Sequence, residues 1–434
     1  MKIGIRREDK SVWERRVPFV PEDLKALKAK GLDVVVQSSP VRAFGDEEFR
    51  AAGIPVRDHL EDRDLIFGIK EVPKEAFLEG RVYVFFAHVI KGQSYNMPML
   101  KTMMEKGVTL IDYERIVDDE NRRLIFFGRH AGLAGMVNSL WAFGKRLAAE
   151  GVETPFAELK QAKDYRDLNE IKAHVTAVGS AIRDGGLPAA IHPVIVGITG
   201  YGNVSAGAQE ILDLLPVVEI LPEAVAETAA GFESPRNRIY KAVFKEHHCV
   251  RPRIGGAAFD LQDYYRRGKD AYENIFEAYL DHLNLLINCV YWDERYPRLV
   301  TLEAVKRLWA DGRQPKLRVI GDISCDPGGS IQCTVDATDP GDPVYVYLPE
   351  NNTVARGVIG HGPVIMAVDI LPTEIPRESS VYFSSVLRGI VEFMARADYS
   401  VPYAELDLPP ELKRAVILYR GRLTPDYAYL HQYL

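Results

Sequence analysis

Short apolar runs alternate with helix-like segments over the first third of the chain. The run in residues 1–5 leads to a helix pattern from Pro21, which has proline in its first turn and Gly31 after its end. Apolar runs separated by helical segments are typical of a parallel sheet that is covered on both faces. The pattern therefore predicts an α/β domain that ends near residue 132. Its further strand runs lie at residues 34–36, 65–69, 82–86 and 109–111.

A second series of the same kind follows. Residues 133 to about 150 carry apolar side chains at helical spacing and predict the connection into a second unit. Strand patterns begin at Val194 and continue through VVEIL, LLINCVYW, LRVIGDIS and VYVYL, which predicts a second parallel sheet. From about Pro363 the pattern returns to helix, and we expect this last part to pack back on the first domain.

Length and composition indicate a folded soluble protein of two or three compact units, with 434 residues, 47% hydrophobic and 26% charged. The formal net charge of -7 gives no broad positive field, which argues against nucleic acid as a partner. The chain turns polar after its first apolar run, without a signal-type core, and no later stretch is apolar for long enough to span a bilayer. We therefore expect a cytoplasmic protein without a membrane partner.

The cysteines give no sign of a disulfide framework or a zinc site. They lie far apart or in strand-like contexts, without CxxC spacing, and we interpret them as mostly buried thiols. His247 and His248 adjoin a cysteine, which suggests a metal, but chain neighbours point in different directions and no second ligand cluster stands out. We therefore expect no metal. The cysteines are Cys249, Cys289, Cys325 and Cys333.

A glycine-rich turn opens the second series. In PVIVGITGYGNVSAGAQEILDLL an apolar strand precedes the turn and an amphipathic helix follows it. Gly200 permits a tight turn, and Gly202 lets the backbone approach a pyrophosphate. The helix N-terminus presents free N–H groups to that anion. The context favours dinucleotide binding over an ordinary strand-to-helix turn.

The turn departs from the GxGxxG pattern at its third glycine. Ser205 stands at that position, and Gly207 supplies a close contact later in the helix. The acid that would hold the ribose 2′-hydroxyl has only approximate candidates in Glu219 and Glu223. The choice between NAD and NADP therefore stays open.

Ionisable side chains follow two strand patterns of the first domain. Lys70 and Glu71 come directly after one strand, and His88 takes the same place on the next. Carboxyl ends of parallel strands are where open α/β sheets bind ligands, and lysine with histidine suits proton transfer near neutral pH. A solvated lysine and a core histidine are the alternatives, each about even when taken alone, but together the two residues favour a site. Arg15 and Arg16 could grip a carboxylate, with a solvated turn as the alternative.

Several motifs resemble a known family. ERRVPFVPEDL, IKEVP, FFAH and DYER are similar to the N-terminal domain shared by alanine dehydrogenase, proton-pumping transhydrogenase and saccharopine dehydrogenase. ITGYGNVSAGAQEILDLLP, INCVYW and GDISCDPGGSIQ, followed by VDILPTEIPRESS, resemble the lysine-ketoglutarate reductase domain, the first half of a bifunctional lysine-degrading enzyme in plants and animals. The resemblance covers nearly the whole chain.

The resemblance implies two Rossmann-like domains with parallel sheets and a cleft between them. The first, catalytic domain is discontinuous and comprises residues 1–132 plus about 363–434, and residues 133–362 form the NAD(P)-binding Rossmann domain. Lys70 and His88 match the acid–base pair of the saccharopine dehydrogenases. The residues implied to bind substrate carboxylates or tune that pair are Arg16, Glu71, Glu114 and Arg123, with Arg15 and Arg122 as near alternatives. The expected cofactor contacts are Gly200, Gly202, Asn203, Val204, Ser205, Glu219, Asn288, Cys289, Asp322 and Asp326.

The implied reaction joins lysine to 2-oxoglutarate. His88 and Lys70 would move protons while an imine forms, and NAD or NADP would carry the hydride that converts the imine to saccharopine. No saccharopine-cleaving domain follows in this sequence, so we expect a separate partner enzyme for that step. Three matters stay open: an amino acid dehydrogenase of the alanine dehydrogenase type on another amine and oxo acid, a non-catalytic nucleotide-binding regulator, and homo-oligomer formation.

Overall fold

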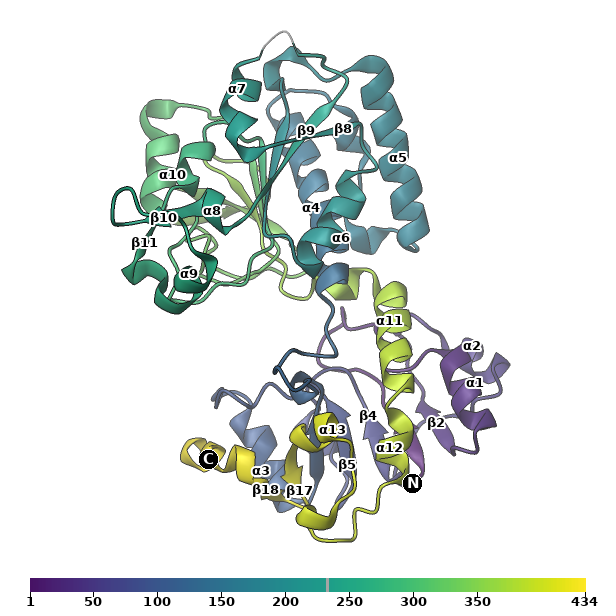
Figure 1. The fold of residues 1–434 in the computed structure, drawn as a ribbon. Coiled ribbons are helices and arrows are strands. Elements are labelled where there is room, and N and C mark those ends of the chain that lie inside the picture. Colours follow the sequence, from purple (N-terminus) through teal and green to yellow (C-terminus); the bar gives the residue numbers. More distant parts are fainter. Residues whose placement is uncertain (232–233) are drawn as a thin grey trace. The chain divides into compact units, whose positions relative to one another are not determined.

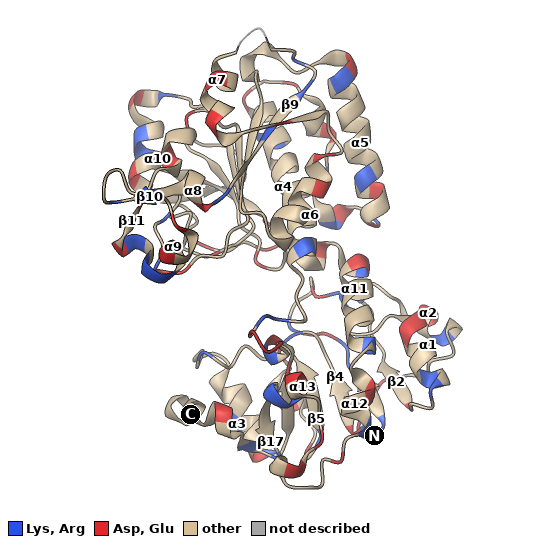
Figure 2. Ribbon diagram, viewed as in Figure 1, with Lys and Arg blue, Asp and Glu red and all other residues tan. Residues whose placement is uncertain are grey.

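The computed structural model describes residues 1–231 and 234–434, and the chain divides into two compact units (Figure 1). Unit 1 comprises Met1–Phe127 and Pro376–Leu434, and unit 2 comprises Gly128–Ile375. Each unit contains a sheet of eight strands. Both sheets are mostly parallel and flanked by helices, which confirms the predicted α/β class. Basic and acidic residues are interspersed over the elements of both units (Figure 2).

The sheet of unit 1 has the order β18-β17-β6-β5-β4-β1-β2-β3, and β1 to β6 are parallel. Its central strands are short and buried on both faces, as the unbroken apolar runs predicted. The strands are β1 (Ile3–Ile5), β2 (Val34–Gln37), β3 (Val56–Arg57), β4 (Leu65–Phe67), β5 (Val82–Phe85), β6 (Thr109–Asp112), β17 (Val416–Tyr419) and β18 (Arg422–Leu423). The helices are α1 (Pro21–Ala29), α2 (Asp46–Ala51), α3 (Met97–Glu105), α11 (Pro376–Arg388), α12 (Val391–Arg396) and α13 (Pro410–Arg414).

The C-terminal segment completes unit 1 through two buried serines. The hydroxyl oxygens of Ser380 and Ser384, on α11, accept the backbone N–H groups of Val17 (2.9 Å) and Val20 (3.0 Å). Strand β17 pairs antiparallel with β6. Segments far apart in sequence therefore share one core, and unit 1 is discontinuous.

The sheet of unit 2 has the order β15-β14-β16-β13-β12-β7-β9-β8, with β14 and β15 antiparallel at one edge. A small antiparallel sheet of two strands, β10 (Val250–Pro252) and β11 (Tyr272–Asn274), is separate from it. The strands are β7 (Ile195–Thr199), β8 (Val217–Ile220), β9 (Ile239–Phe244), β12 (Leu285–Asn288), β13 (Val319–Asp322), β14 (Val344–Leu348), β15 (Thr353–Arg356) and β16 (Val364–Met366). The helices are α4 (Gly128–Ala149), α5 (Leu168–Gly185), α6 (Asn203–Leu212), α7 (Val225–Ala230), α8 (Glu246–Cys249), α9 (Leu261–Arg267) and α10 (Leu302–Leu308).

The ends of unit 2 differ from those expected from the sequence. Strand β16 pairs with β13 and β14, so residues 363–375 lie in unit 2 rather than in the first domain. Helix α4 begins at Gly128 and packs closely on α6, where a Cβ on Gly132 would lie 1.9 Å from the Val204 carbonyl oxygen. The VYVYL run forms the antiparallel strand β14, not a parallel one. Apolar runs encode burial, but they do not encode strand direction.

No helix in the described ranges 1–231 and 234–434 is both long and apolar enough to cross a membrane.

Candidate active site

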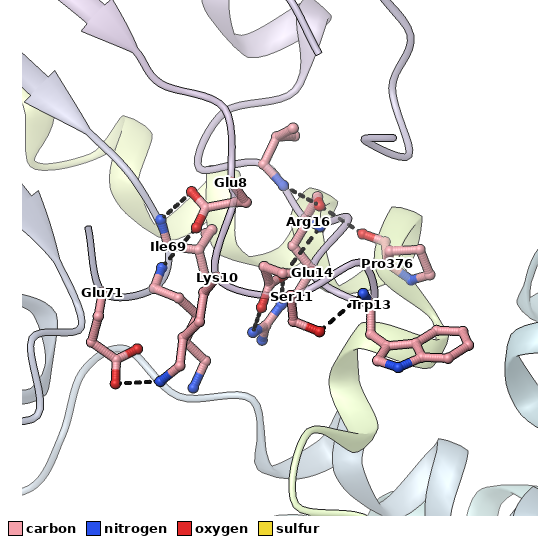
Figure 3. Close-up of polar contacts among 12 residues, drawn as sticks. Glu8, Lys10, Ser11, Trp13, Glu14, Arg16, Ile69, Glu71 and Pro376 are labelled. Atoms are coloured by element: carbon pink, nitrogen blue, oxygen red, sulfur yellow. Dashed lines mark hydrogen bonds and ion pairs between the residues drawn. The ribbon is translucent and has the colours of Figure 1, made fainter. Parts of the chain in front are cut away.

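A buried carboxylate joins a histidine and a lysine at the ends of two adjacent strands of unit 1. Oε1 of Glu71 lies 2.9 Å from Nδ1 of His88 and 2.5 Å from Nζ of Lys10 (Figure 3 shows the lysine contact). Burial alone would raise the pKa of Glu71, but the hydrogen bonds and charges of His88 and Lys10 outweigh it and hold the pKa at about 2. Because the ionised carboxylate can only accept, Nδ1 of His88 is the donor and Nε2 is left for other partners.

The backbone at His88 is held in an uncommon conformation. Its φ is +48°, in the left-handed region that residues other than glycine seldom adopt. The buried side chain of Asn96 donates hydrogen bonds to the carbonyl oxygens of Ala87 and His88, both at 3.1 Å. Such local strain persists where surrounding contacts maintain it, and it is frequent at functional sites. Asn96 therefore stabilises the position of the imidazole.

Lys70 precedes Glu71 in the chain, and the charge of the Glu71 carboxylate acts on its amine. Burial, together with the positive charge of Arg16, lowers the pKa of Lys70 from its ordinary value. Within the described part of the chain, the Lys70 amine makes no ion pair within 4.0 Å. This lowered pKa makes the neutral amine, the form that accepts a proton, easier to reach than it is for an exposed lysine.

Glu8 fixes the backbone that carries Lys70. Its buried carboxylate accepts the N–H groups of Ile69 at 2.7 Å and Lys70 at 3.0 Å (Figure 3). Burial raises the pKa of Glu8 to about 7, against the opposing charge of Arg6. Sequence reasoning missed Glu8 and Lys10, because a polar run such as RREDK is ordinarily a solvated surface.

Arg16 is already paired. Its Nε and Nη2 donate to the two carboxylate oxygens of Glu14 at 2.8 and 2.6 Å, and both side chains are at most 4% exposed (Figure 3). Its guanidinium also lies 4.4 Å from the ring centroid of Phe127. Arg15 is exposed and donates to the Val41 carbonyl oxygen at 3.1 Å. The structure therefore leaves only part of the Arg16 guanidinium for a substrate carboxylate.

The second pair is Glu114 with Arg123, which share a salt bridge. The Glu114 side chain is mostly buried and that of Arg123 is half exposed. Arg122 instead points to Asp118, at 2.7 Å, and is 74% exposed. Of the two neighbouring arginines, Arg123 is thus the one that the structure brings to Glu114.

The glycine-rich turn of unit 2 has the geometry that a pyrophosphate requires. Gly200 has φ +87°, and a Cβ there would lie 3.2 Å from the carbonyl oxygen of Cys289, so the turn needs glycine. Around Gly202 no atom lies within 4 Å of an added Cβ, which leaves its backbone open to a ligand. Helix α6 begins at the next residue, and its first N–H groups belong to Asn203, Val204 and Ser205. These residues fit a bound dinucleotide.

The displaced glycine has a packing role. A Cβ on Gly207 would lie 2.0 Å from the Arg129 carbonyl oxygen on α4, so Gly207 permits close contact between α6 and α4. Ser205, at the usual glycine position, is buried and accepts a hydrogen bond from Gln209 at 3.0 Å.

Asn288 and Asp322 form a buried network at the ends of neighbouring strands. Asn288 accepts from Thr199 at 2.8 Å and donates to Asp322 at 2.9 Å, and Thr334 donates to Asp322 at 2.7 Å. Burial raises the pKa of Asp322 to about 6. Their polar atoms face each other, so these residues join the ends of the strands. Asp326 is exposed in the following loop.

Glu219 is not beside the glycine-rich turn. It lies on β8 at the edge of the sheet, 3.1 Å from Lys241 on β9, and β9 separates it from β7. Glu223 lies 3.4 Å from His248. The strand that follows the glycine-rich turn in the sequence is therefore not the neighbour of β7 in the sheet.

Comparison with known proteins supports the motif resemblance. Residues 4–134 match the family model described as alanine dehydrogenase/PNT, N-terminal domain. The chain is 37% identical over 447 residues to alpha-aminoadipic semialdehyde synthase of Arabidopsis thaliana, covering 99% of this chain and 41% of that protein. It is 33% identical over 443 residues to the mitochondrial alpha-aminoadipic semialdehyde synthase of Bos taurus, covering 99% of this chain and 47% of that protein. The chain thus spans less than half the length of these relatives.

A third relative is matched over most of both chains. Saccharopine dehydrogenase [NAD(+), L-lysine-forming] of Emericella nidulans is 26% identical over 409 residues, covering 89% of this chain and 90% of that protein.

Solved structures share the fold. An L-alanine dehydrogenase superposes with a TM-score of 0.64 at 18% identity, covering 100% of this chain and 99% of that one. A transhydrogenase from Sinorhizobium meliloti gives 0.54 at 16% identity, covering 98% and 100%. Residues 4–134 therefore match the alanine dehydrogenase/PNT N-terminal domain family, and over most of its length the chain is similar to alpha-aminoadipic semialdehyde synthase and saccharopine dehydrogenase.

Proposed function

We propose that this chain is an NAD(P)-dependent oxidoreductase that forms or cleaves saccharopine, the product of lysine and 2-oxoglutarate. The observation that carries the proposal is the group of Lys70, Glu71 and His88 at the ends of β4 and β5. It unites a lysine of lowered pKa with a histidine whose ring is oriented by an ionised carboxylate. One similar protein, matched over most of both chains, is named saccharopine dehydrogenase [NAD(+), L-lysine-forming], which supports this choice of reaction.

The two basic groups divide the proton transfers. Lys70, when neutral, accepts a proton from the substrate ammonium, which frees the amine to attack the carbonyl carbon of 2-oxoglutarate. His88 donates a proton from Nε2 to the carbinolamine hydroxyl, which leaves as water and yields the imine. Glu71 holds the ring through Nδ1 and stabilises its protonated form. Bound NAD(P)H supplies the hydride that reduces the imine carbon.

Two cations of unit 1 favour an acidic substrate. Half-exposed Arg123 and the unpaired part of Arg16 can each donate to a carboxylate, and a planar guanidinium suits that geometry. A dicarboxylic oxo acid supplies more carboxylates than pyruvate does. This is why we favour 2-oxoglutarate.

The test follows NADH or NADPH absorbance with 2-oxoglutarate while lysine, ornithine, alanine and ammonia are added one at a time. Oxidation that requires lysine supports the proposal. Turnover with pyruvate and ammonia, and none with lysine, would show an amino acid dehydrogenase of the alanine dehydrogenase type instead. No turnover with any amine despite nucleotide binding would indicate a regulatory protein. As a control, Lys70→Met and His88→Asn should lose turnover and keep nucleotide binding.

A further inference from the structure

Strand order places an unexpected segment beside the glycine-rich turn. Strand β9 lies between β7 and β8, with Thr199 opposite Phe244, and the Gly200 N–H donates to the Phe244 carbonyl oxygen at 3.0 Å. In dinucleotide-binding folds, the strand next to the glycine strand delivers the group that contacts the adenosine ribose. In this chain the strand next to the glycine strand is β9, so the residues directly after Phe244 take this position, and the end of β8 does not.

Glu246 occupies this place and is bonded to the turn itself. Its carboxylate accepts the hydroxyl of Tyr201, the residue between the two turn glycines, with distances of 3.2 and 3.3 Å to its two oxygens. It also accepts the hydroxyl of Tyr265 on α9 at 2.8 Å. Glu246 is only partly buried. Since a carboxylate has about four acceptor positions, two tyrosine donors leave capacity for the hydroxyls of a ribose.

Neighbouring cationic groups are otherwise engaged. His248 accepts the Lys245 backbone N–H through Nδ1 at 2.9 Å, and burial together with His247 lowers the pKa of His248, so its ring is neutral near pH 7. The Lys245 amine lies over the Tyr201 ring, 5.7 Å from its centroid. The carboxylate is therefore the charged group that is hydrogen-bonded to the turn.

We propose that Glu246 holds the adenosine ribose of the bound dinucleotide and makes this chain prefer NAD(H) to NADP(H). The proposal rests on the proposed function only in that the chain binds a nicotinamide dinucleotide. A ribose diol donates to the carboxylate, whereas a 2′-phosphate, nearly doubly charged at neutral pH, is repelled by it. Glu219 and Glu223 take no part, since they pair with Lys241 and His248.

The experiment measures dissociation constants of NADH and NADPH by nucleotide fluorescence, with no amine or oxo acid present. The proteins are wild type, Glu246→Gln, Glu246→Arg and the control Glu219→Gln. We expect wild type to bind NADH at least about tenfold more tightly than NADPH, since like charges in contact are strongly disfavoured. Glu246→Gln should reduce this ratio, Glu246→Arg should reverse it, and Glu219→Gln should leave it unchanged.

The wild-type ratio tests the proposal even if a variant folds poorly, because a preference for NADPH overturns it. Unchanged ratios in both Glu246 variants, or a ratio that Glu219→Gln reduces, overturn it as well. These outcomes would overturn the ribose contact and would not bear on the proposed lysine-dependent reaction. Conversely, the expected ratios without lysine-dependent oxidation support the ribose contact and overturn only the substrate assignment. Failure to bind either nucleotide overturns both.

Discussion

Replacing Glu71 by glutamine tests the central ion pairs without reference to any reaction. Glutamine keeps the size of the side chain but cannot attract Lys10 and His88 as an anion. The pKa of Glu71 falls from 4.5 to about 2 on folding, which corresponds to roughly 3 kcal/mol at about 1.4 kcal/mol for each pKa unit. The Lys10 side chain is 45% exposed, so solvent screening reduces the expected loss to about 2 kcal/mol.

The pH dependence of this loss has a definite sign. A carboxyl group whose pKa is depressed on folding stabilises the protein above its unfolded pKa, and this stability disappears as the pH falls through the folded pKa. The difference between wild type and Glu71→Gln should therefore be full above about pH 5 and fall to roughly half near pH 3. Urea unfolding read by pulsed hydrogen exchange on β4 and β5 peptides separates unit 1 from unit 2.

Glu75 provides the matched control, because its side chain is 74% exposed and forms a long ion pair of 3.9 Å with the exposed Lys74. Glu75→Gln should leave the urea midpoint nearly unchanged. Equal midpoints for wild type and Glu71→Gln at neutral pH, or a difference that grows as the pH falls, would refute the reasoning.

Three further predictions concern Glu8, Asn96 and the two glycines of the turn. Burial raises the pKa of Glu8 to about 7, so its contribution to stability is present below about pH 4.5 and is lost as the pH rises through 7. Measured by urea unfolding, the stability of wild type relative to Glu8→Gln should fall by up to roughly 3 kcal/mol over that range. Asn96→Ala removes two hydrogen bonds to the backbone at His88, and should cost about 1–3 kcal/mol and reduce turnover while NADH binding persists; unchanged turnover would contradict its positioning role. In Gly202→Ala the added methyl group has room in the fold, so this variant should keep the melting temperature of wild type and bind NADH more weakly. Gly200→Ala should instead lower the melting temperature, because φ is +87° at Gly200. Normal NADH binding by Gly202→Ala would argue against the pyrophosphate contact.

Local features of this protein could be predicted from its sequence. Unbroken apolar runs indicated the buried parallel strands, because such strands are covered on both faces and need no polar side. Gly200 and Gly202, between a strand and a helix, predicted the turn that the structure contains. Lys70 and His88 were predicted to lie at one edge of a sheet because the carboxyl ends of adjacent parallel strands meet there, and β4 and β5 are such neighbours.

Only the tertiary structure decided which of the remaining polar groups meet. Glu219 and Glu246 look alike in the sequence, but the insertion of β9 beside β7 brings Glu246 to the turn and leaves Glu219 at the sheet edge. In the sequence, Glu8 and Lys10 resemble solvated charges. In the folded protein Glu8 accepts the backbone N–H of Lys70, and Lys10 pairs with Glu71. Periodicity reports whether a position is buried, since that depends on near neighbours along the chain. Strand order and charge pairing depend on contacts between distant segments, and no local pattern encodes them.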